Sequence, residues 1–492
     1  MIHAQHIHFT YPALHPQHPA TTLFHDLTLS SAGGETVVVT GAGGSGKSTL
    51  CHLLAGLTHY TGGRVSGDLH VAGYPILTQP PPVGVIGVLF QDAATQLFNH
   101  TAEDEVAWGL EALGMPASEI GPQVAAALEH FGLLAERTRP PWMLSGGQQK
   151  RLALAAIWAM HPRLLLLDDP LGGLDPAGQV EVLETVATLH QHGVTILMTT
   201  QHPQAIALAS QWLLLENGTA HALSSPGATA RLINAGVIYP PERWPNLRLQ
   251  RAGATAGSAA GEDALELAHV DFRYPDGHTA LRDVNLRIPR GQFVALVGSN
   301  GAGKSTLIRH FNGLLSPTRG TVRVLGRDVT GRAVGELARD VGFLFQRPEQ
   351  QLFAATVRAE IAYGLRQLRL PDPDARIEIA LARFDLNGVA DVPPATLNYG
   401  AQRAVTLAAQ AALDTPILVL DEPTVGLDGR GWARLLDWLA ERRAAGVTVV
   451  LVTHEMSLAA CADRVVALDA GQVVADGSPD EVIPQPPTRV AG

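Results

Sequence analysis

Two glycine-rich segments of the sequence have the residue types and spacing of a phosphate-binding loop. Residues 41–49 and 298–306 both contain the pattern G-x-x-x-x-G-K-[ST], shortly after an apolar run. In such a loop, backbone N–H groups and the next helix N-terminus surround the β- and γ-phosphates, and a serine hydroxyl ligates Mg²⁺. The candidate phosphate-binding residues are Gly41, Gly43, Gly44, Ser45, Gly46, Lys47, Ser48 and Thr49, and Gly298, Asn300, Gly301, Ala302, Gly303, Lys304, Ser305 and Thr306. Ser48 and Ser305 are the candidate magnesium ligands.

A pair of acidic residues ends an apolar run in each half of the sequence. These pairs are Asp168 with Asp169, and Asp421 with Glu422. Because open α/β sheets bind ligands at the carboxyl ends of their strands, Asp168 and Asp421 are expected to support Mg²⁺. The second carboxylate of each pair can polarise an attacking water. The candidate catalytic residues are Glu422, His454, Asp169 and His202. A lone histidine at a strand end is more often structural, but the order of the motifs favours contact with the γ-phosphate.

The two halves repeat the same landmarks in the same order, which indicates a duplication. Each landmark of the first half recurs 252 to 257 residues later. The repeated pairs are Lys47 with Lys304, Gln91 with Gln346, Asp168 with Asp421, Asp175 with Asp428, and His202 with His454. Two phosphate-binding patterns, each followed by all the remaining motifs, leave little room for a chance match.

The elements that would position these residues have the pattern of an α/β fold. Continuous apolar runs, such as residues 417–420, are typical of parallel strands covered on both faces of a sheet. Alternating apolar residues at Ile7, Phe9 and Tyr11 predict a strand with one buried face. Thr101, followed by three acidic residues, predicts the start of a helix. We therefore expect an α/β core with a helical insertion in each half.

Length and composition restrict the remaining possibilities. A chain of 492 residues is too long for one hydrophobic core. Prolines and small residues at 237–262 predict a flexible linker between domains at 1–236 and 263–492. A formal charge of −11 without a basic block argues against nucleic acid as a partner. Two distant cysteines indicate a reducing cytosol, and no apolar run predicts a transmembrane segment.

The segment Leu144-Ser-Gly-Gly-Gln148 resembles the signature of the ATP-binding-cassette family, and the other motifs are similar to that family's over nearly all of both halves. The resemblance implies two tandem cassettes, each with a P-loop α/β core, an antiparallel β subdomain and a helical insertion, that hydrolyse ATP with Mg²⁺. In that family two cassettes close head to tail, so each ATP lies between the phosphate loop of one and the signature of the other. The further contacts implied are Tyr11 and Tyr274 with adenine, Gln91 and Gln346 with nucleotide and Mg²⁺, and Ser145, Gly146, Gly147 and Gln148 with the facing nucleotide.

Two departures from the family pattern distinguish the halves. Asn398 and Tyr399 occupy the signature position of the second half, where tyrosine replaces a glycine, although Asn398 can still cap a helix. Asp169 replaces the usual glutamate and is shorter by one C–C bond length, about 1.5 Å. A misplacement of about 1 Å can cost on the order of a hundredfold in rate. Head-to-tail pairing puts both departures into the site of Lys47, so we expect the Lys304 site to perform most of the hydrolysis; the alternative is that both sites hydrolyse.

The segments after the two loop glutamines are similar to those of energy-coupling-factor importers. Both reach a Gln-Leu-Phe sequence, at residues 96–98 and 351–353. The resemblance implies two partners, an integral-membrane coupling protein and a small membrane protein that binds a vitamin or metal ion. It places the chain on the cytoplasmic face of the cell membrane, and fused pairs of this kind are similar to importer ATPases for thiamine or its hydroxymethylpyrimidine precursor. The Leu-Phe pairs are expected either to line the groove that receives the membrane helices or to belong to the core.

Two other functions fit parts of this pattern. A fused sugar-importer ATPase typically has a degraded second phosphate loop, whereas Lys304 and Ser305 are intact here. A soluble tandem cassette protein that acts on ribosomes or DNA usually carries a charged linker, a coiled coil or cysteine clusters. The linker expected here is short and almost uncharged.

Overall fold

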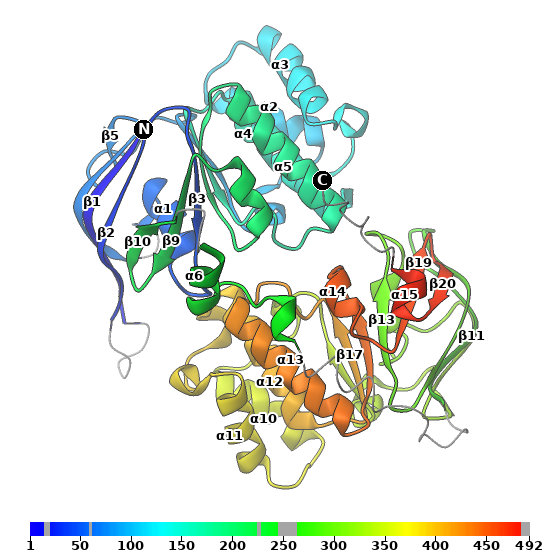
Figure 1. Ribbon diagram of the computed structural model, residues 1–492. Helices are drawn as coiled ribbons and strands as arrows, with labels where there is room; N and C mark the ends of the chain where they lie inside the picture. The colour runs from blue at the N-terminus through cyan, green and yellow to red at the C-terminus, as the bar shows by residue number, and fades with distance from the viewer. Residues whose placement is uncertain (14–19, 59–61, 224–227, 245–262, 484–492) are drawn as a thin grey trace, which may run out of the picture. The chain divides into compact units, whose positions relative to one another are not determined.

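The computed structural model describes residues 1–13, 20–58, 62–223, 228–244 and 263–483. The chain divides into two compact units, Met1–Ile238 and Tyr239–Gly492, and each contains one set of the repeated motifs (Figure 1). Most of the expected linker, residues 245–262, lies outside the described residues. The segment before it belongs to the second unit, because the ring of Trp244 stacks on Trp432 with centroids 5.5 Å apart.

The first unit contains a six-stranded and a four-stranded sheet. The strands of the larger sheet are β3 (Thr36–Thr40), β6 (Ile86–Leu89), β7 (Leu164–Asp168), β8 (Thr195–Thr199), β9 (Gln211–Glu216) and β10 (Thr219–Ala222). Their order is β10-β9-β3-β8-β7-β6, and all pairs are parallel except β10 with β9. The smaller sheet is antiparallel and contains β1 (Ile2–Tyr11), β2 (Thr21–Ser31), β4 (Arg64–Val71) and β5 (Tyr74–Pro75).

The second unit repeats both sheets. The strands of its larger sheet are β13 (Phe293–Val297), β16 (Val341–Leu344), β17 (Ile417–Asp421), β18 (Thr448–Val452), β19 (Arg464–Asp469) and β20 (Gln472–Gly477). Their order is β16-β17-β18-β13-β19-β20, which is the order of the first unit read from the opposite edge of the sheet. The smaller, antiparallel sheet contains β11 (Asp263–Arg273), β12 (Thr279–Pro289), β14 (Arg319–Val324) and β15 (Arg327–Asp328).

The central strands of both units are buried along their whole length. Every residue of β3, β7, β8, β13, β17 and β18 is buried. In β3, Val38 packs into the core on one face of the sheet, and Val37 and Val39 pack into the core on the other. Alternate residues of a strand point to opposite faces, so an apolar run is needed where both faces are covered. The parallel sheet predicted from these runs is confirmed.

Helices α2 to α4 pack together as a helical lobe in the first unit, and α10 to α12 do so in the second (Figure 1). The helices of the first unit are α1 (Lys47–Leu54), α2 (Ala102–Ala112), α3 (Ala117–His130), α4 (Gly146–Ala159), α5 (Pro176–Gln191) and α6 (Ala228–Asn234). Those of the second are α8 (Lys304–Ile308), α9 (Val334–Leu337), α10 (Val357–Gln367), α11 (Pro373–Arg383), α12 (Tyr399–Leu413), α13 (Gly429–Ala444), α14 (Met456–Ala459) and α15 (Pro479–Val482). Within the described ranges, none of these helices combines the length and apolarity needed to span a membrane.

The predicted start of α2 is confirmed. The Thr101 hydroxyl accepts a hydrogen bond from the backbone N–H of Asp104 at 3.2 Å, and three carboxylates lie in the first turn. Thr356 caps α10 in the same way. Each cap satisfies one of the free N–H groups at the helix start, which fixes the point where the chain enters the helical lobe.

Candidate functional site

Each phosphate-binding loop connects a central strand to a helix, β3 to α1 and β13 to α8. Gly46 and Gly303 immediately precede these helices, and both have φ of 101°. This left-handed conformation strains residues with a Cβ. A Cβ on Gly303 would also lie 2.6 Å from the carbonyl oxygen of Ala280. Glycine is therefore required at this point for backbone N–H groups to turn toward a ligand.

The lysine of each loop is hydrogen-bonded to the loop's own main chain. Lys304 Nζ donates to the carbonyl oxygens of Gly298 at 2.7 Å and Ser299 at 2.9 Å. Lys47 makes the equivalent two bonds in the first unit at the same distances. These bonds hold each ammonium group at the loop, where it can neutralise phosphate oxygens.

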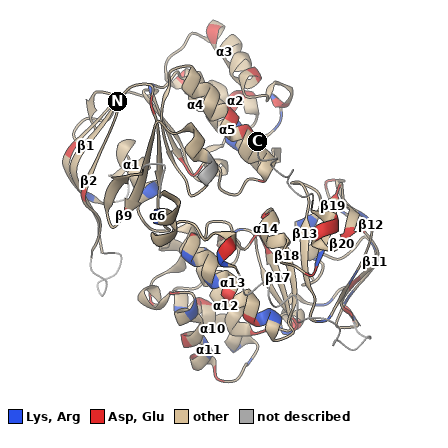
Figure 2. Cartoon of the chain, viewed as in Figure 1, with Lys and Arg blue, Asp and Glu red and all other residues tan. Residues whose placement is uncertain are grey.

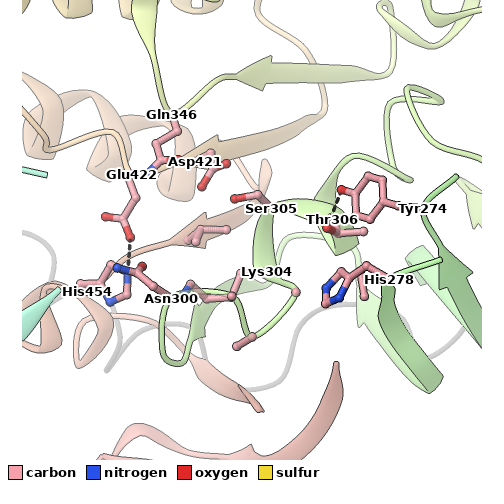
Figure 3. Close-up of a pocket in the computed structure, with 15 residues that line it drawn as sticks. Tyr274, His278, Asn300, Lys304, Ser305, Thr306, Gln346, Asp421, Glu422 and His454 are labelled. Atoms are coloured by element: carbon pink, nitrogen blue, oxygen red, sulfur yellow. Dashed lines mark hydrogen bonds and ion pairs between the residues drawn. The ribbon is translucent and has the colours of Figure 1, made fainter. Parts of the chain in front are cut away.

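A cavity of about 240 Å³ opens beside the second loop (Figure 3). It brings together, within one unit, predicted residues from segments far apart in the sequence. Its lining residues are Tyr274, His278, Ala280, Asn300, Gly301, Ala302, Gly303, Lys304, Ser305, Thr306, Gln346, Asp421, Glu422, Val452 and His454. The cavity thus combines a phosphate-binding loop, two carboxylates and an aromatic ring, as a nucleotide site requires.

The residues predicted to hold magnesium meet at one side of this cavity. The Ser305 hydroxyl hydrogen-bonds to the Asp421 carboxylate, and burial raises the pKa of Asp421. Asp421 Oδ1 is buried and has no hydrogen-bond partner among the described residues. Gln346 follows β16 and also lines the cavity. Hydroxyl, carboxylate and amide oxygens are suitable Mg²⁺ ligands, so these three residues fit that ion.

Glu422 and His454 form the opposite end of the acidic site. Glu422 Oε1 lies 3.4 Å from His454 Nε2, the contact drawn in Figure 3. Burial, and to a smaller extent the neighbouring Asp421 carboxylate, raise the pKa of Glu422 to about 8. Glu422 has φ of 47°, so its backbone is in the left-handed region. A buried carboxylate with a raised pKa beside an imidazole is the arrangement expected of a group that exchanges a proton with water.

The proposed adenine-stacking rings are held in place by hydrogen bonds to the helix after each loop. Tyr274 OH lies 2.9 Å from Thr306 Oγ1, and Tyr11 OH lies 2.8 Å from Thr49 Oγ1. The ring of His278, from the hairpin between β11 and β12, lies nearly parallel to that of Tyr274, with centroids 6.4 Å apart. Sequence reasoning missed His278, because nothing in its spacing distinguishes it from other residues of a hairpin.

The equivalent aspartate of the first unit has an additional partner. Thr199 Oγ1 donates to Asp168 Oδ1 at 2.7 Å, and Ser48 also hydrogen-bonds to this carboxylate. The residue equivalent to Thr199 in the second unit is Val452, which has no hydroxyl. Gln91 follows β6 just as Gln346 follows β16. The first unit therefore has the same candidate magnesium ligands, but one oxygen of its aspartate is already occupied.

Asp169 shares the backbone conformation of Glu422 but has different contacts. Its φ is 45°, and its carboxylate is partly exposed. Asp169 Oδ1 lies 3.4 Å from Thr200 Oγ1. In the described part of the chain, no ion pair joins Asp169 to His202, in contrast to the pair of the second unit. The shorter side chain therefore lacks the contact to histidine that Glu422 makes.

The two signature segments both begin helices. Ser145 Oγ accepts from the N–H of Gln148 at 3.3 Å, and Gln148 Oε1 accepts from the N–H of Ser145 at 2.9 Å. This reciprocal capping box starts α4 and places Gly146 and Gly147 in its first turn. Asn398 Oδ1 accepts from the N–H of Ala401 at 3.0 Å, so the expected cap of α12 is confirmed.

Three further polar residues near the signature helices and the first phosphate-binding loop were missed by sequence reasoning. Lys150 and Arg403 occupy equivalent buried positions in α4 and α12. Gln201 Nε2 donates to the carbonyl oxygen of Gly41 at 3.3 Å. A charged residue on the apolar face of a helical pattern was the available signal for Lys150 and Arg403, whereas Gln201 had none.

Known proteins of one family resemble both halves of this chain. The chain matches the family described as ABC transporter over residues 24–172 and 281–425. It is 32% identical to a protein named as an ABC transporter ATP-binding protein of Caldanaerobacter subterraneus, over 89% of this chain and 85% of that protein. A protein of the same description from Streptomyces avermitilis is 35% identical over 92% of this chain and 91% of its own length. A solved structure of cbiO1 from Clostridium perfringens, part of the ABC transporter complex cbiONQ, is 32% identical, with a TM-score of 0.41 over 45% of this chain and 91% of that chain.

Proposed function

The chain belongs to the ABC transporter ATPase family, and we propose that it is the energy-coupling subunit of an energy-coupling-factor importer for a vitamin or metal ion. Its established part is that of the ATP-binding component of an ABC transporter, which hydrolyses ATP with Mg²⁺. The proposal places it against the cytoplasmic face of the membrane. The observation that carries the importer proposal is a pair of exposed aromatic side chains at the same place in each unit.

These aromatic pairs join the segment after each loop glutamine to the helix that follows. Phe98, 59% exposed, meets Trp108 edge to face at 5.1 Å. At the equivalent place in the second unit, Phe353, 65% exposed, meets Tyr363 at 4.7 Å. Exposed aromatic clusters of this kind mark protein interaction sites. We assign these surfaces to the membrane coupling protein.

The leucines beside these phenylalanines have a different role. Leu97 and Leu352 are partly buried and pack against the cores of their units. Of each expected Leu-Phe pair, therefore, the leucine contributes to the core and only the phenylalanine is displayed. The first unit displays two more apolar side chains, Trp142 and Met143, at positions where the second unit has Ala395 and Thr396.

In the proposed reaction the second unit performs most of the hydrolysis. Lys304 and the loop N–H groups bind the phosphates, Tyr274 stacks on the base, and Glu422 accepts a proton from the attacking water. Mg²⁺, held by Ser305, Gln346 and Asp421, would neutralise phosphate oxygens and orient them. His454 orients Glu422 and can contact the γ-phosphate. We assign these roles by the contacts described above.

The proposed cycle requires the two cassettes to close head to tail. In that arrangement the first signature, residues 145–148, would complete the site of Lys304, and the second, with Asn398 and Tyr399, would complete the site of Lys47. At the site of Lys304, hydrolysis is supported by the free Oδ1 of Asp421 and by the contact of Glu422 with His454. At the site of Lys47, the hydrogen bond from Thr199 to Asp168 and the shorter side chain of Asp169 support slow hydrolysis, so that this site mainly holds ATP.

Affinity purification of the full chain from detergent-solubilised membranes tests the importer proposal. We expect two integral membrane proteins to co-purify in fixed ratio, and reconstitution of the complex to drive ATP-dependent uptake of a vitamin or metal ion. Co-sedimentation with ribosomes and no integral protein would support the soluble alternative instead. Sugar uptake by the complex would support the sugar importer.

In the described part of the chain, acidic and basic residues are interspersed in the view of Figure 2. This distribution does not favour a nucleic-acid partner.

A further inference from the structure

The side chain of Tyr399 contacts the segment that contains Gln346, in its own unit. Tyr399 is the first residue of α12, and its equivalent in the first unit is Gly146. We propose that Tyr399 and Arg403 are positioning residues that fix the glutamine loop (residues 346–353) of the second unit, a role that rests on the proposed hydrolysis at Lys304. Sequence reasoning considered Tyr399 only as an obstacle at the site of Lys47.

Three hydrogen bonds join the start of α12 to the main chain at the glutamine loop. Arg403 Nη1 donates to the carbonyl oxygen of Phe345 at 2.6 Å, and Nη2 donates to that of Gln346. The Tyr399 hydroxyl donates to the same Gln346 oxygen at 3.3 Å. A carbonyl oxygen has two lone pairs and can accept both bonds. The peptide group after Gln346 is therefore held from two side chains.

The burial of Arg403 makes these bonds selective for one loop conformation. Its side chain is fully buried, and its guanidinium carbon lies 5.9 Å from the centroid of the Tyr399 ring. A buried charge that loses its partners is strongly destabilising. If the loop moved away, Arg403 would lose both carbonyl acceptors, so the residue favours the conformation in which Gln346 lines the cavity.

The Tyr399 ring also packs closely against Gly426. A Cβ at Gly426 would collide with the ring, and Gly426 has φ of 81°. The glycine lies in the turn between β17, which ends in Asp421, and α13. Tyr399 therefore contacts both the glutamine loop, at Gln346, and the turn after the acidic pair, at Gly426.

The first unit uses the equivalent position for a different contact. Lys150, the counterpart of Arg403, donates to the carbonyl oxygens of Pro170 at 2.9 Å and Gly172 at 2.7 Å, in the turn after Asp169. Gly146 has no side chain that could reproduce the Tyr399 hydrogen bond. The pair of positioning side chains is thus a property of the second unit, the one with the complete acidic site.

The position of Gln346 gives this contact a role in the reaction. Its side chain lines the cavity beside Asp421, while its carbonyl is held by α12. The same loop continues to Phe353 of the exposed aromatic pair. Fixing the carbonyl orients the amide oxygen that we assign to Mg²⁺. Loosening it should therefore weaken the binding of Mg²⁺ rather than the binding of adenine.

Steady-state ATP hydrolysis by the full chain at varied Mg²⁺ tests the proposal. All proteins carry Asp169→Asn, so that hydrolysis at the first unit is suppressed. Tyr399→Phe keeps the ring against Gly426 and removes one hydrogen bond, so we expect the half-saturating Mg²⁺ concentration to rise about 2- to 10-fold. Tyr239→Phe is the matched control, since the Tyr239 hydroxyl donates to the Arg243 carbonyl at 2.8 Å outside the site. It should leave the Mg²⁺ requirement unchanged.

Arg403 variants supply a second measurement. Arg403→Met should raise the Mg²⁺ requirement more than Tyr399→Phe does. Arg403→Lys should raise it less than Arg403→Met, because the lysine ammonium group can still donate to a carbonyl. The same Mg²⁺ requirement in Tyr399→Phe and Tyr239→Phe would overturn the positioning role. Loss of activity in the Asp169→Asn chain alone would overturn the assignment of hydrolysis to the second unit, and with it this role.

Discussion

His454 Nε2 lies 3.4 Å from Oε1 of Glu422 in the second unit. The two residues come from the ends of adjacent parallel strands, β18 and β17, so sheet register brings them together. In the first unit, glutamate is replaced by Asp169, whose carboxylate is directed to Thr200 instead.

Glu422→Gln should remove most ATP hydrolysis, and Asp169→Asn should remove little. We expect a loss of about 10²- to 10⁴-fold for the first change, the range for a general base. The second change should leave the total rate nearly unchanged, because the shorter Asp169 side chain already makes that site slow. Phosphate release by the full chain is the measurement, with ATP binding as the control for folding. Equal losses would show that both sites hydrolyse.

Tyr274→Ala should weaken ATP binding at the second loop. Base stacking on an aromatic ring contributes about 1–3 kcal/mol, so the dissociation constant for ATP should rise about 5- to 150-fold. Tyr274→Phe retains the ring and loses only the hydrogen bond to Thr306, so most of the affinity should remain. Equilibrium binding of labelled ATP, fitted to two sites, measures both. An alanine variant that binds as tightly as the phenylalanine variant would exclude stacking.

Lys150 should make the stability of the first unit depend on pH. Burial lowers its pKa to about 8, although Asp169, Asp92 and Asp168 act in the opposite direction. In the unfolded chain a lysine titrates near pH 10.4. As pH falls from about 10.4 to 8, the unfolded state takes up a proton that the folded state does not, so the free energy of unfolding falls. Below about pH 8 this contribution is constant.

Urea unfolding of the wild-type chain and Lys150→Met measures this effect. The free energy of unfolding of the wild type, relative to the variant, should rise between pH 8 and 10.4 by at most about 1.4 kcal/mol per pH unit. Comparison with the variant cancels groups that titrate in both proteins. If the free energies of unfolding of the two proteins change in parallel over this pH range, the pKa of Lys150 is not lowered in the folded chain.

Serine at Phe98 and Phe353 should release the chain from its membrane partners. Each phenylalanine is more than half exposed, so the substitutions remove contact area without opening a cavity in the core. We expect at least a tenfold fall in co-purified integral protein, measured by quantitative immunoblotting. Val474→Ser, at an exposed residue of β20, is the control for losing an exposed apolar side chain. Unchanged recovery of the membrane proteins would place the docking surface elsewhere.

The sequence by itself determined the local features of both units. The loops 41–49 and 298–306, the continuous apolar strands and the cap at Thr101 were all predictable, because each depends on residue types within a few positions. Backbone conformation at glycine, alternation of burial in a strand and satisfaction of helix N–H groups are local effects. The α/β fold and its repetition followed from these features.

Only the tertiary structure decided which side chains of distant segments meet. Nothing in the spacing of Tyr399 showed that its hydroxyl would donate to the Gln346 carbonyl oxygen in its own unit. Nor did the spacing show that Lys150 would bind the turn at Pro170 while Arg403 would bind the glutamine loop. A buried charged group goes wherever packing offers it acceptors, and those acceptors come from segments about 20 to 60 residues away in the chain. Periodicity within a segment therefore predicts burial, but the partner is set by how the segments pack.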